Sequence, residues 1–268
     1  MKAQDVKNAV KEKYSQIARQ NENNSSSPCC GESSCCGGEL EISMIGDDYH
    51  NVAGYNPEAD LGLGCGVPTE FAGLKPGQHV LDLGSGAGND CFVARAEVGK
   101  SGKVIGIDFS EEMVKKARKN KQKRGFNHVY FLSGDIEEIP LKADQFDVVL
   151  SNCVLNLVPD KHKAFSEIQR VLKSGGHFCV SDVVIKGTLP DKLRKDAEMY
   201  AGCVSGALEL EEYVDVIRQA GFRDMQIHKQ KRIELPQETL EKYIPENELK
   251  DFNTGDKGIF SITVSAYK

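Results

Sequence analysis

The sequence has no tryptophan among its 268 residues and no apolar run long enough to cross a membrane. A membrane-spanning helix needs about 20 consecutive apolar residues, and no window approaches that length. The first residues are lysine-rich and polar, without the apolar segment of a signal peptide. We therefore expect a cytoplasmic protein whose intrinsic fluorescence comes from tyrosine.

An excess of basic residues is also missing, since 34 Lys and Arg face 40 Asp and Glu, for a net charge of -6. Binding a nucleic-acid backbone usually requires a local excess of Lys and Arg. One basic run extends from Lys115 to Arg124, but its spacing around Met113 and Ala117 is typical of a solvated helix face. A nucleic-acid partner is therefore not expected.

The cysteines do not suggest a disulfide framework. There are nine of them, an odd number, and a reducing compartment keeps thiols free. Each is therefore a candidate core residue, metal ligand or redox-active group, and its place in the sequence has to decide which.

Strands and helices alternate through the middle of the chain. The apolar pattern predicts strands at 79–83, 103–108, 128–132, 145–151 and 177–185, with helices near 89–98, 110–122 and 160–172. Such alternation predicts an α/β fold, a parallel sheet with helices on both faces. We expect a catalytic core over residues 72–185, between an N-terminal region (1–71) and a C-terminal region (186–268).

The flanking regions have patterns of their own. Residues 3–19 carry apolar side chains at helical spacing, which predicts an amphipathic helix that must lie on another surface. Residues 21–38 form a polar loop with four of the nine cysteines, and residues 54–66 are rich in glycine. The C-terminal region is predicted to hold a helical stretch through Met199, Cys203 and Ala207, a helix near 210–220, and strands near 223–230 and 259–267 that continue the sheet.

A glycine-rich motif, DLGSGAGND at 82–90, follows the first predicted strand and leads into a helix. Ligands bind at this end of the strands in open α/β sheets, and Asp108 ends the next strand where a carboxylate can accept hydrogen bonds from ribose hydroxyls. The alternative is that the glycines only make a turn and that Asp108 caps the following helix. The two features together favour a nucleoside-like ligand. Asn89 stands where dinucleotide enzymes place glycine, so their pattern does not fit.

The motif instead resembles the D-x-G-x-G-x-G sequence of class I S-adenosylmethionine-dependent methyltransferases. The resemblance continues through SGDIEEIPL, FDVVLSN and LKSGGHFCVSD and covers about residues 72–185. It implies a Rossmann-like sheet that binds S-adenosylmethionine, with an N-terminal helical, cysteine-rich extension and a C-terminal α+β part. The residues it implies for the cofactor are Asp82, Gly84, Ser85, Gly86, Asp108, Phe109, Met113, Asp135, Ile136 and Asn152. Met113 alone would more often be a core residue.

Within that class the chain resembles the arsenite methyltransferases, which detoxify arsenic. The motifs that carry this likeness are LGLGCGVP, GSGAGNDCFVAR, SNCVLNLVPDK and YAGCVSGAL. The resemblance implies that Cys65, Cys153 and Cys203 act as catalytic ligands of trivalent arsenic. Thiolates are natural ligands for such a soft three-coordinate centre, and the lone pair left on arsenic can attack a sulfonium methyl group without a general base.

Each of these cysteines also has a simpler explanation. A free cysteine is most often a small buried apolar residue, and Cys153 and Cys203 lie in apolar surroundings. Cys65, between two glycines, is the hardest to explain as core. Cys91 and Cys179 stand at apolar positions of a helix and a strand, and for these two we expect core packing.

The cluster CCGESSCC, residues 29–36, lies in the polar loop, where cysteines rarely serve a core. Its spacing does not match the usual C-x2-4-C pairs of a zinc site, and it has no histidine, so zinc is not favoured. The family resemblance implies one further arsenic-handling cysteine here, at Cys35 or Cys36. It would relay arsenic or form a disulfide with Cys65. Cys29 and Cys30 compete for the same role.

The sequence thus predicts a monomeric enzyme that methylates arsenite and methylarsenite, delivered as thiol complexes, to methyl and dimethyl products. An external thiol reductant, thioredoxin or glutathione, would keep arsenic trivalent. Two alternatives stay open: a class I methyltransferase acting on another small molecule, and a non-catalytic thiol protein that binds arsenic or metal. A small-molecule methyltransferase would more naturally show a His, Glu or Tyr base beside the methyl group.

Overall fold

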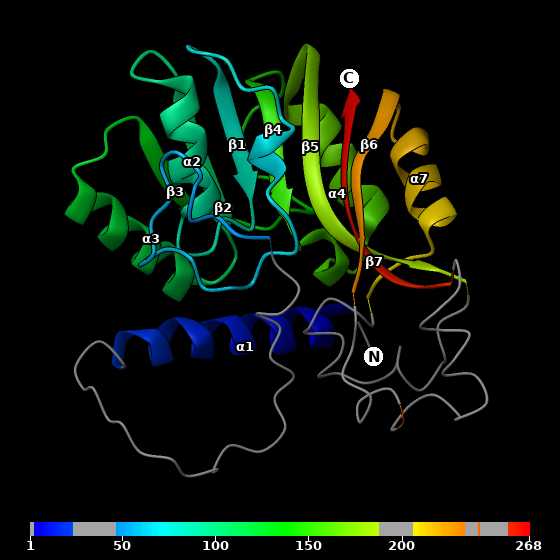
Figure 1. Ribbon diagram of the computed structural model, residues 1–268, viewed down its shortest axis with the longest axis horizontal. Coiled ribbons are helices and arrows are strands. Elements are labelled where there is room, and N and C mark those ends of the chain that lie inside the picture. The colour runs from blue at the N-terminus through cyan, green and yellow to red at the C-terminus, as the bar shows by residue number, and fades with distance from the viewer. Residues whose placement is uncertain (1–2, 24–46, 188–205, 234–240, 242–256) are drawn as a thin grey trace.

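The computed structural model describes residues 3–23, 47–187, 206–233, 241 and 257–268. One sheet of seven strands forms the centre, in the order β3-β2-β1-β4-β5-β7-β6 (Figure 1). The bounds are β1 His79–Leu83, β2 Lys103–Asp108, β3 Val129–Ser133, β4 Phe146–Asn152, β5 Leu172–Lys186, β6 Arg223–Arg232 and β7 Gly258–Tyr267. The first five strands are parallel, whereas β7 runs antiparallel to both of its neighbours. The predicted class I methyltransferase fold is confirmed.

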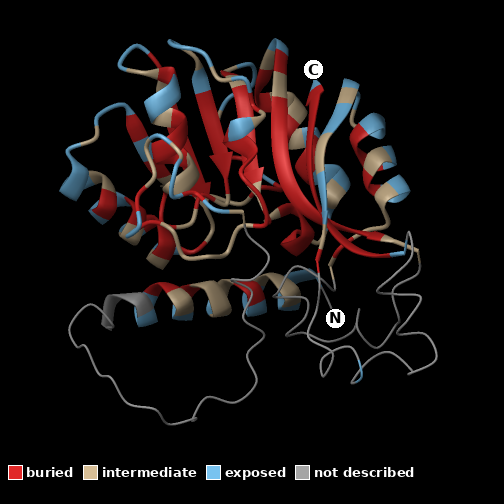
Figure 2. Ribbon diagram, in the orientation of Figure 1, coloured by how far each residue is buried: buried red, intermediate tan, exposed pale blue. Residues whose placement is uncertain are grey.

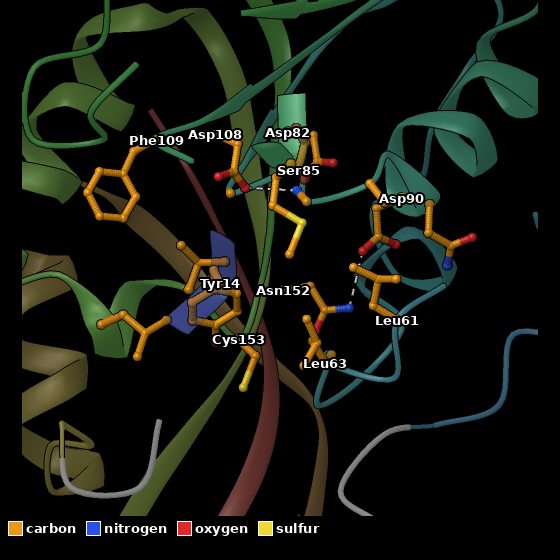
Figure 3. A pocket seen from close by; sticks show the side chains of 18 of the residues that line it. Tyr14, Leu61, Leu63, Asp82, Ser85, Asp90, Asp108, Phe109, Asn152 and Cys153 are labelled. Atoms are coloured by element: carbon orange, nitrogen blue, oxygen red, sulfur yellow. Dashed lines mark hydrogen bonds between the residues drawn. The ribbon is translucent and has the colours of Figure 1, made fainter. Parts of the chain in front are cut away.

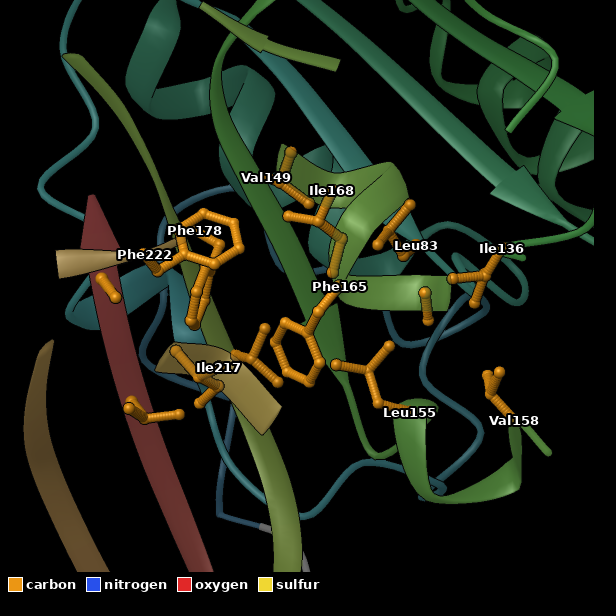
Figure 4. Close-up of a cluster of buried hydrophobic side chains, with 14 of the residues drawn as sticks. Leu83, Ile136, Val149, Leu155, Val158, Phe165, Ile168, Phe178, Ile217 and Phe222 are labelled. Carbon is orange, nitrogen blue, oxygen red and sulfur yellow. The ribbon is translucent and has the colours of Figure 1, made fainter. Parts of the chain in front are cut away.

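Helices cover both faces of the sheet. Strands β1, β2, β4, β5 and β7 are buried along most of their length, whereas no residue of β6 is buried (Figure 2). On one face, α2 (Asn89–Val98), α3 (Glu111–Arg124) and the short helix η3 (Pro68–Glu70) pack on the strands. On the other face lie α4 (Lys161–Val171) and α7 (Leu210–Gln219). There Phe165 and Phe222 pack on Phe178 with ring centroids 5.6 and 4.8 Å away (Figure 4).

Helix α1 (Ala3–Asn23) lies crosswise beneath the carboxyl ends of the central strands (Figure 1). Its apolar residues Val6, Val10 and Tyr14 pack in a cluster with Leu157 and Phe109. Its polar side is tied to α3, because Ser15 Oγ donates to Glu112 at 2.9 Å. The hydrogen bond from Ser15 is the largest cause of the lowered pKa of Glu112, about 2, and a hydrogen bond from Arg19 contributes as well. The predicted amphipathic helix therefore covers the edge of the sheet where ligands bind.

Three local predictions were wrong. Strand β5 begins at Leu172, at the end of α4, and not at 177, and its pairing with β4 has a bulge where the glycines at 175 and 176 occur. The helical stretch predicted to reach Ala207 does not include that residue, since Ala207 lies in an extended segment before α7 whose Leu208 carbonyl accepts from Ile185 N. The remainder of that stretch, with Met199 and Cys203, is outside the described residues. Finally, α1 extends four residues past 19, to Asn23.

None of the helices in the described ranges is long and apolar enough to span a membrane.

Candidate active site

A pocket opens between the carboxyl ends of β1, β2 and β4 and the helix α1 (Figure 3). Every residue that the sequence suggested for the cofactor lines this pocket, and so does Cys153. Additional lining comes from α1 and from the segment before β1, through Lys7, Val10, Tyr14, Tyr49, Ala59, Asp60, Leu61, Leu63 and Gly64. The pocket therefore joins the glycine loop, the segment that carries Cys65, and the N-terminal helix.

The glycine loop leaves room for a ligand. At Gly86 the backbone has φ +51°, and a Cβ placed there would meet no atom within 4 Å. Beside it, the Ser85 hydroxyl is buried and has no hydrogen-bond partner among the described residues. Space without protein atoms and an unpaired hydroxyl are what a bound polar molecule would fill. The loop thus fits a ligand better than it fits a turn alone.

Asp108 ties this loop to β2. Its carboxylate accepts from Gly86 N at 2.9 Å and from Ser110 N at 2.8 Å. Burial nevertheless raises the pKa of Asp108 to about 6, because the main-chain hydrogen bonds offset desolvation only in part. Ser110 itself is the N-cap of α3, and its hydroxyl accepts from Met113 N. The capping role considered for Asp108 is thus filled by Ser110, and the carboxylate faces the pocket.

Two further carboxylates make the opposite wall strongly acidic. Burial raises the pKa of Asp90 to about 6, and burial together with the nearby charge of Asp90 raises that of Asp82 well above its ordinary value. Asp82 accepts from the Cys91 thiol at 3.2 Å. These carboxylates are buried and have no cationic partner among the described residues, so a cationic ligand would stabilise their charged forms. Asp90 was overlooked in the sequence, although it ends the glycine motif.

A second overlooked group links this acidic wall to the Cys65 segment. The Tyr49 hydroxyl lies 2.7 Å from an oxygen of Asp90, and the Asn152 amide nitrogen lies 2.8 Å from that hydroxyl and 3.2 Å from the other Asp90 oxygen (Figure 3). Burial, reinforced by Asp90, raises the pKa of Tyr49. No pattern in the sequence marked Tyr49, because it stands in an irregular segment far from Asp90 along the chain.

At the far end of the pocket, Asp135 meets α1. Lys7 Nζ contacts Asp135 Oδ2 at 2.6 Å and also pairs with Glu137. Burial lowers the pKa of Lys7, but the hydrogen bonds to the two carboxylates outweigh it and raise the value overall. Met113 and Ile136 are both buried, and both line the same pocket as Asp135. Helix α1 thus encloses this end of the pocket.

Of the three predicted arsenic ligands, the structure describes two. Cys153 follows β4 directly, lines the pocket, and has the left-handed φ of +59°, which is unusual for a residue other than glycine. Cys65 is fully buried in the same apolar cluster as Cys153 but does not line the pocket. Cys203 and the cluster Cys29, Cys30, Cys35 and Cys36 lie outside the described residues.

The two cysteines predicted as core are buried. Cys179 donates to the Pro68 carbonyl at 3.2 Å, and burial raises its pKa to about 12. Burial, with Asp82 next in importance, also raises the pKa of Cys91. Within the described ranges there is no group of three or more His, Cys, Asp or Glu residues that could hold a metal ion.

The strand order, the glycine loop and the acidic residues at the strand ends define a class I methyltransferase. A family model described as a methyltransferase domain matches residues 74–242. Arsenite methyltransferases from Halobacterium salinarum and Homo sapiens are 41% and 38% identical to the chain, over 84% and 62% of its length. The chain belongs to the methyltransferase domain family and groups with the arsenite methyltransferases within it. It spans 59% and 46% of those two relatives' own lengths.

One solved structure agrees with this grouping, and a second agrees with the fold. An arsenic(III) S-adenosylmethionine methyltransferase from Chlamydomonas reinhardtii is 34% identical, with a TM-score of 0.64 over 76% of this chain and 67% of that one. A phosphoethanolamine N-methyltransferase from Haemonchus contortus in complex with S-adenosylhomocysteine is 23% identical, with a TM-score of 0.59 over 76% and 53%. The second likeness concerns the fold alone.

Proposed function

We propose that this chain transfers methyl groups from S-adenosylmethionine to trivalent arsenic held by the thiolates of Cys65, Cys153 and Cys203. The observation that carries the proposal is the position of Cys153, which directly follows β4 and lines the pocket that has the acidic wall. A soft thiolate ligand at that place suits a soft, electron-rich substrate atom. The arsenite methyltransferases that the chain resembles support the choice of arsenic.

The pocket's residues fit the cofactor. Asp82 and Asp90 would receive its cationic amino group, Asp108 its ribose hydroxyls, and Asp135 with Ile136 and Met113 its adenine. Gly84, Ser85 and Gly86 would lie along its methionine portion, with Phe109 beside the ribose. When bound, S-adenosylmethionine supplies an electrophilic sulfonium methyl group. The protein's contribution is then mainly placement, which can lower a barrier by several kcal/mol or more.

The thiolates would set the order of events. Arsenite offers three ligand positions and methylarsenite two, because each methyl group occupies one. We propose that Cys153 and Cys203 serve every transfer and that Cys65 is needed for the first. Arsenic would arrive as a thiol complex and pass inward through one of the N-terminal cysteines. Thioredoxin or glutathione would keep it trivalent, with the monomeric enzyme working in the cytoplasm.

Speciation of arsenic tests the proposal. The full chain is incubated with arsenite, S-adenosylmethionine and glutathione, and soluble and volatile arsenic species are separated and quantified. We expect methyl and dimethyl arsenic to accumulate in proportion to enzyme. If only inorganic arsenic is recovered while the chain binds S-adenosylhomocysteine, the substrate assignment is refuted.

Cofactor affinity should depend on acidity. The pKa values of Asp90 and Asp108 are raised to about 6, so below that pH both carboxyl groups are protonated. These protons must leave before the carboxylates can bind the cofactor's amino group and ribose hydroxyls. We expect the affinity for S-adenosylhomocysteine to fall as pH drops through 6, by about tenfold per pH unit for each proton that must leave.

The same shifts have the opposite effect on the ligand-free fold. Because the folded-state pKa values exceed the ordinary value of 3.8, these groups contribute stability that is fully present below 3.8 and is lost as pH rises through about 6. Titration calorimetry from pH 7.5 to 5, with melting curves alongside, measures both effects. A dissociation constant that is flat across this range would contradict the assignment of these carboxylates.

A further inference from the structure

The main chain around Cys65 is held by side chains and not by secondary structure. Cys65 N donates to Asn152 Oδ1 at 3.0 Å, and the Cys65 carbonyl accepts from the Ser261 hydroxyl on β7. The next carbonyl, that of Gly66, accepts from Asn152 Nδ2 at 2.8 Å. The side chain of Asn152 therefore forms hydrogen bonds with the main chain on both sides of the Cys65 carbonyl.

Asn152 is also the residue before Cys153, at the end of a central strand. Cys153 N donates to the Ser181 carbonyl of β5 at 2.8 Å, so this end of β4 is fixed to the sheet. A Cβ at Gly64 would come within 2.7 Å of Asn152 Nδ2, so the Cys65 segment approaches the amide as closely as glycine permits. This amide thus connects the Cys65 segment to the end of β4 that carries Cys153, alongside the Ser261 bond to the Cys65 carbonyl and the Tyr49 bond to the Gly66 carbonyl.

The orientation of the amide is set by its neighbours. Its oxygen must face the Cys65 N–H, and its nitrogen faces three acceptors: the Gly66 carbonyl, the Tyr49 hydroxyl and an Asp90 oxygen. An asparagine amide has two N–H donors. Both are taken by protein groups, and the oxygen already accepts from Cys65. Little hydrogen-bonding capacity is left for a cofactor, although Asn152 lines its pocket.

We propose that Asn152 is a positioning residue for the first methyl transfer: it holds Cys65 beside Cys153, so that arsenite can be bound by both. The inference rests on the proposed function. Methylarsenite needs only two thiolates, and Cys65 is not one of them. Loss of the Asn152 amide therefore weakens the first transfer more than the second, because the loss of its hydrogen bond to Asp90 is common to both transfers. A residue that held the cofactor would affect both transfers equally, as would a residue needed only for folding.

The test compares kcat/KM for arsenite with kcat/KM for methylarsenite in the full chain. For Asn152→Ala we expect the ratio of the two to fall about tenfold or more, since small misplacements of reacting groups carry large rate penalties. Ser261→Ala removes the hydrogen bond to the Cys65 carbonyl from outside the pocket and should lower the ratio in the same direction by a smaller factor. Asn127→Ala, an exposed asparagine, is the matched control.

The outcomes separate the two claims. No methylated arsenic from the unmodified chain refutes the proposed function, and this inference falls with it. An active unmodified chain whose ratio is unchanged in Asn152→Ala, or in which both transfers fall by one factor, overturns the role of Asn152 alone. If Asn152→Ala does not fold, Ser261→Ala decides: a lowered ratio supports the positioning of Cys65, and an unchanged ratio refutes it.

Discussion

Replacing Cys153 with serine should abolish both methyl transfers, with losses of at least about 100-fold for arsenite and for methylarsenite alike. Serine keeps the size of the side chain and its place at the pocket, but a hydroxyl is a poor ligand for a soft centre. Cys203→Ser should behave in the same way. Cys65→Ser should abolish the transfer to arsenite and spare the transfer to methylarsenite, which has only two positions to fill.

The matched control is Cys179→Ser. Cys179 is as buried as Cys65, but it lies on β5 and donates to the Pro68 carbonyl, which a serine hydroxyl can also do. We expect both transfers to continue in that variant. Affinity for S-adenosylhomocysteine should be unchanged in all of the cysteine variants. If Cys65→Ser loses both transfers to the same extent, the assignment of two thiolates to the second step is wrong.

The second large effect is expected at Asp108. In Asp108→Ala the ribose would lose a charged acceptor, and Gly86 N would lose its partner. Hydrogen bonds to charged groups contribute about 1.5–3 kcal/mol each, so losing the bonds to the two ribose hydroxyls corresponds to an affinity for S-adenosylhomocysteine roughly 100-fold weaker or more, whereas the lost Gly86 bond affects the fold. Calorimetry at pH 7.5, where the carboxylate of Asp108 is ionised, measures this loss.

Stability should not follow affinity in this variant. A buried carboxylate whose pKa is raised to about 6 is costly to the ligand-free fold above that pH, so its removal offsets part of the lost hydrogen bonding. Asp215→Ala serves as control, because Asp215 is an exposed residue of α7 that pairs with Arg218 at 3.4 Å. Unaltered cofactor affinity in Asp108→Ala would show that this carboxylate only fastens the glycine loop to β2.

Much of the fold could be predicted because its signals are local. Each of the first four strands is a short, largely apolar run, and β1 and β2 have the predicted bounds. The glycine loop and Asp108 could be placed because parallel strands deliver their carboxyl ends to one edge. Strand β5 was predicted too short, because two glycines after Lys173 indicate a turn, whereas the structure accommodates them in a bulge.

The acidic wall and its connection to Cys65 could not be predicted. Asp90, Tyr49 and Asn152 come from a helix, an irregular segment and a strand end, and only the tertiary structure brings them within 3.2 Å of one another. The raised pKa values have the same origin, since burial is a property of the fold and not of the motif. Likewise, the apolar side of α1 is evident in the sequence, but nothing there says that it covers the pocket.

Transfer of a labelled methyl group tests the central claim most directly. The chain is incubated with arsenite, glutathione and S-adenosylmethionine whose sulfonium methyl is deuterated, and the masses of the arsenic products are recorded. We expect methyl arsenic that carries the deuterated methyl group, formed by the unmodified chain and missing with Cys153→Ser. Arsenic recovered without the label, from a chain that binds S-adenosylhomocysteine, would contradict it.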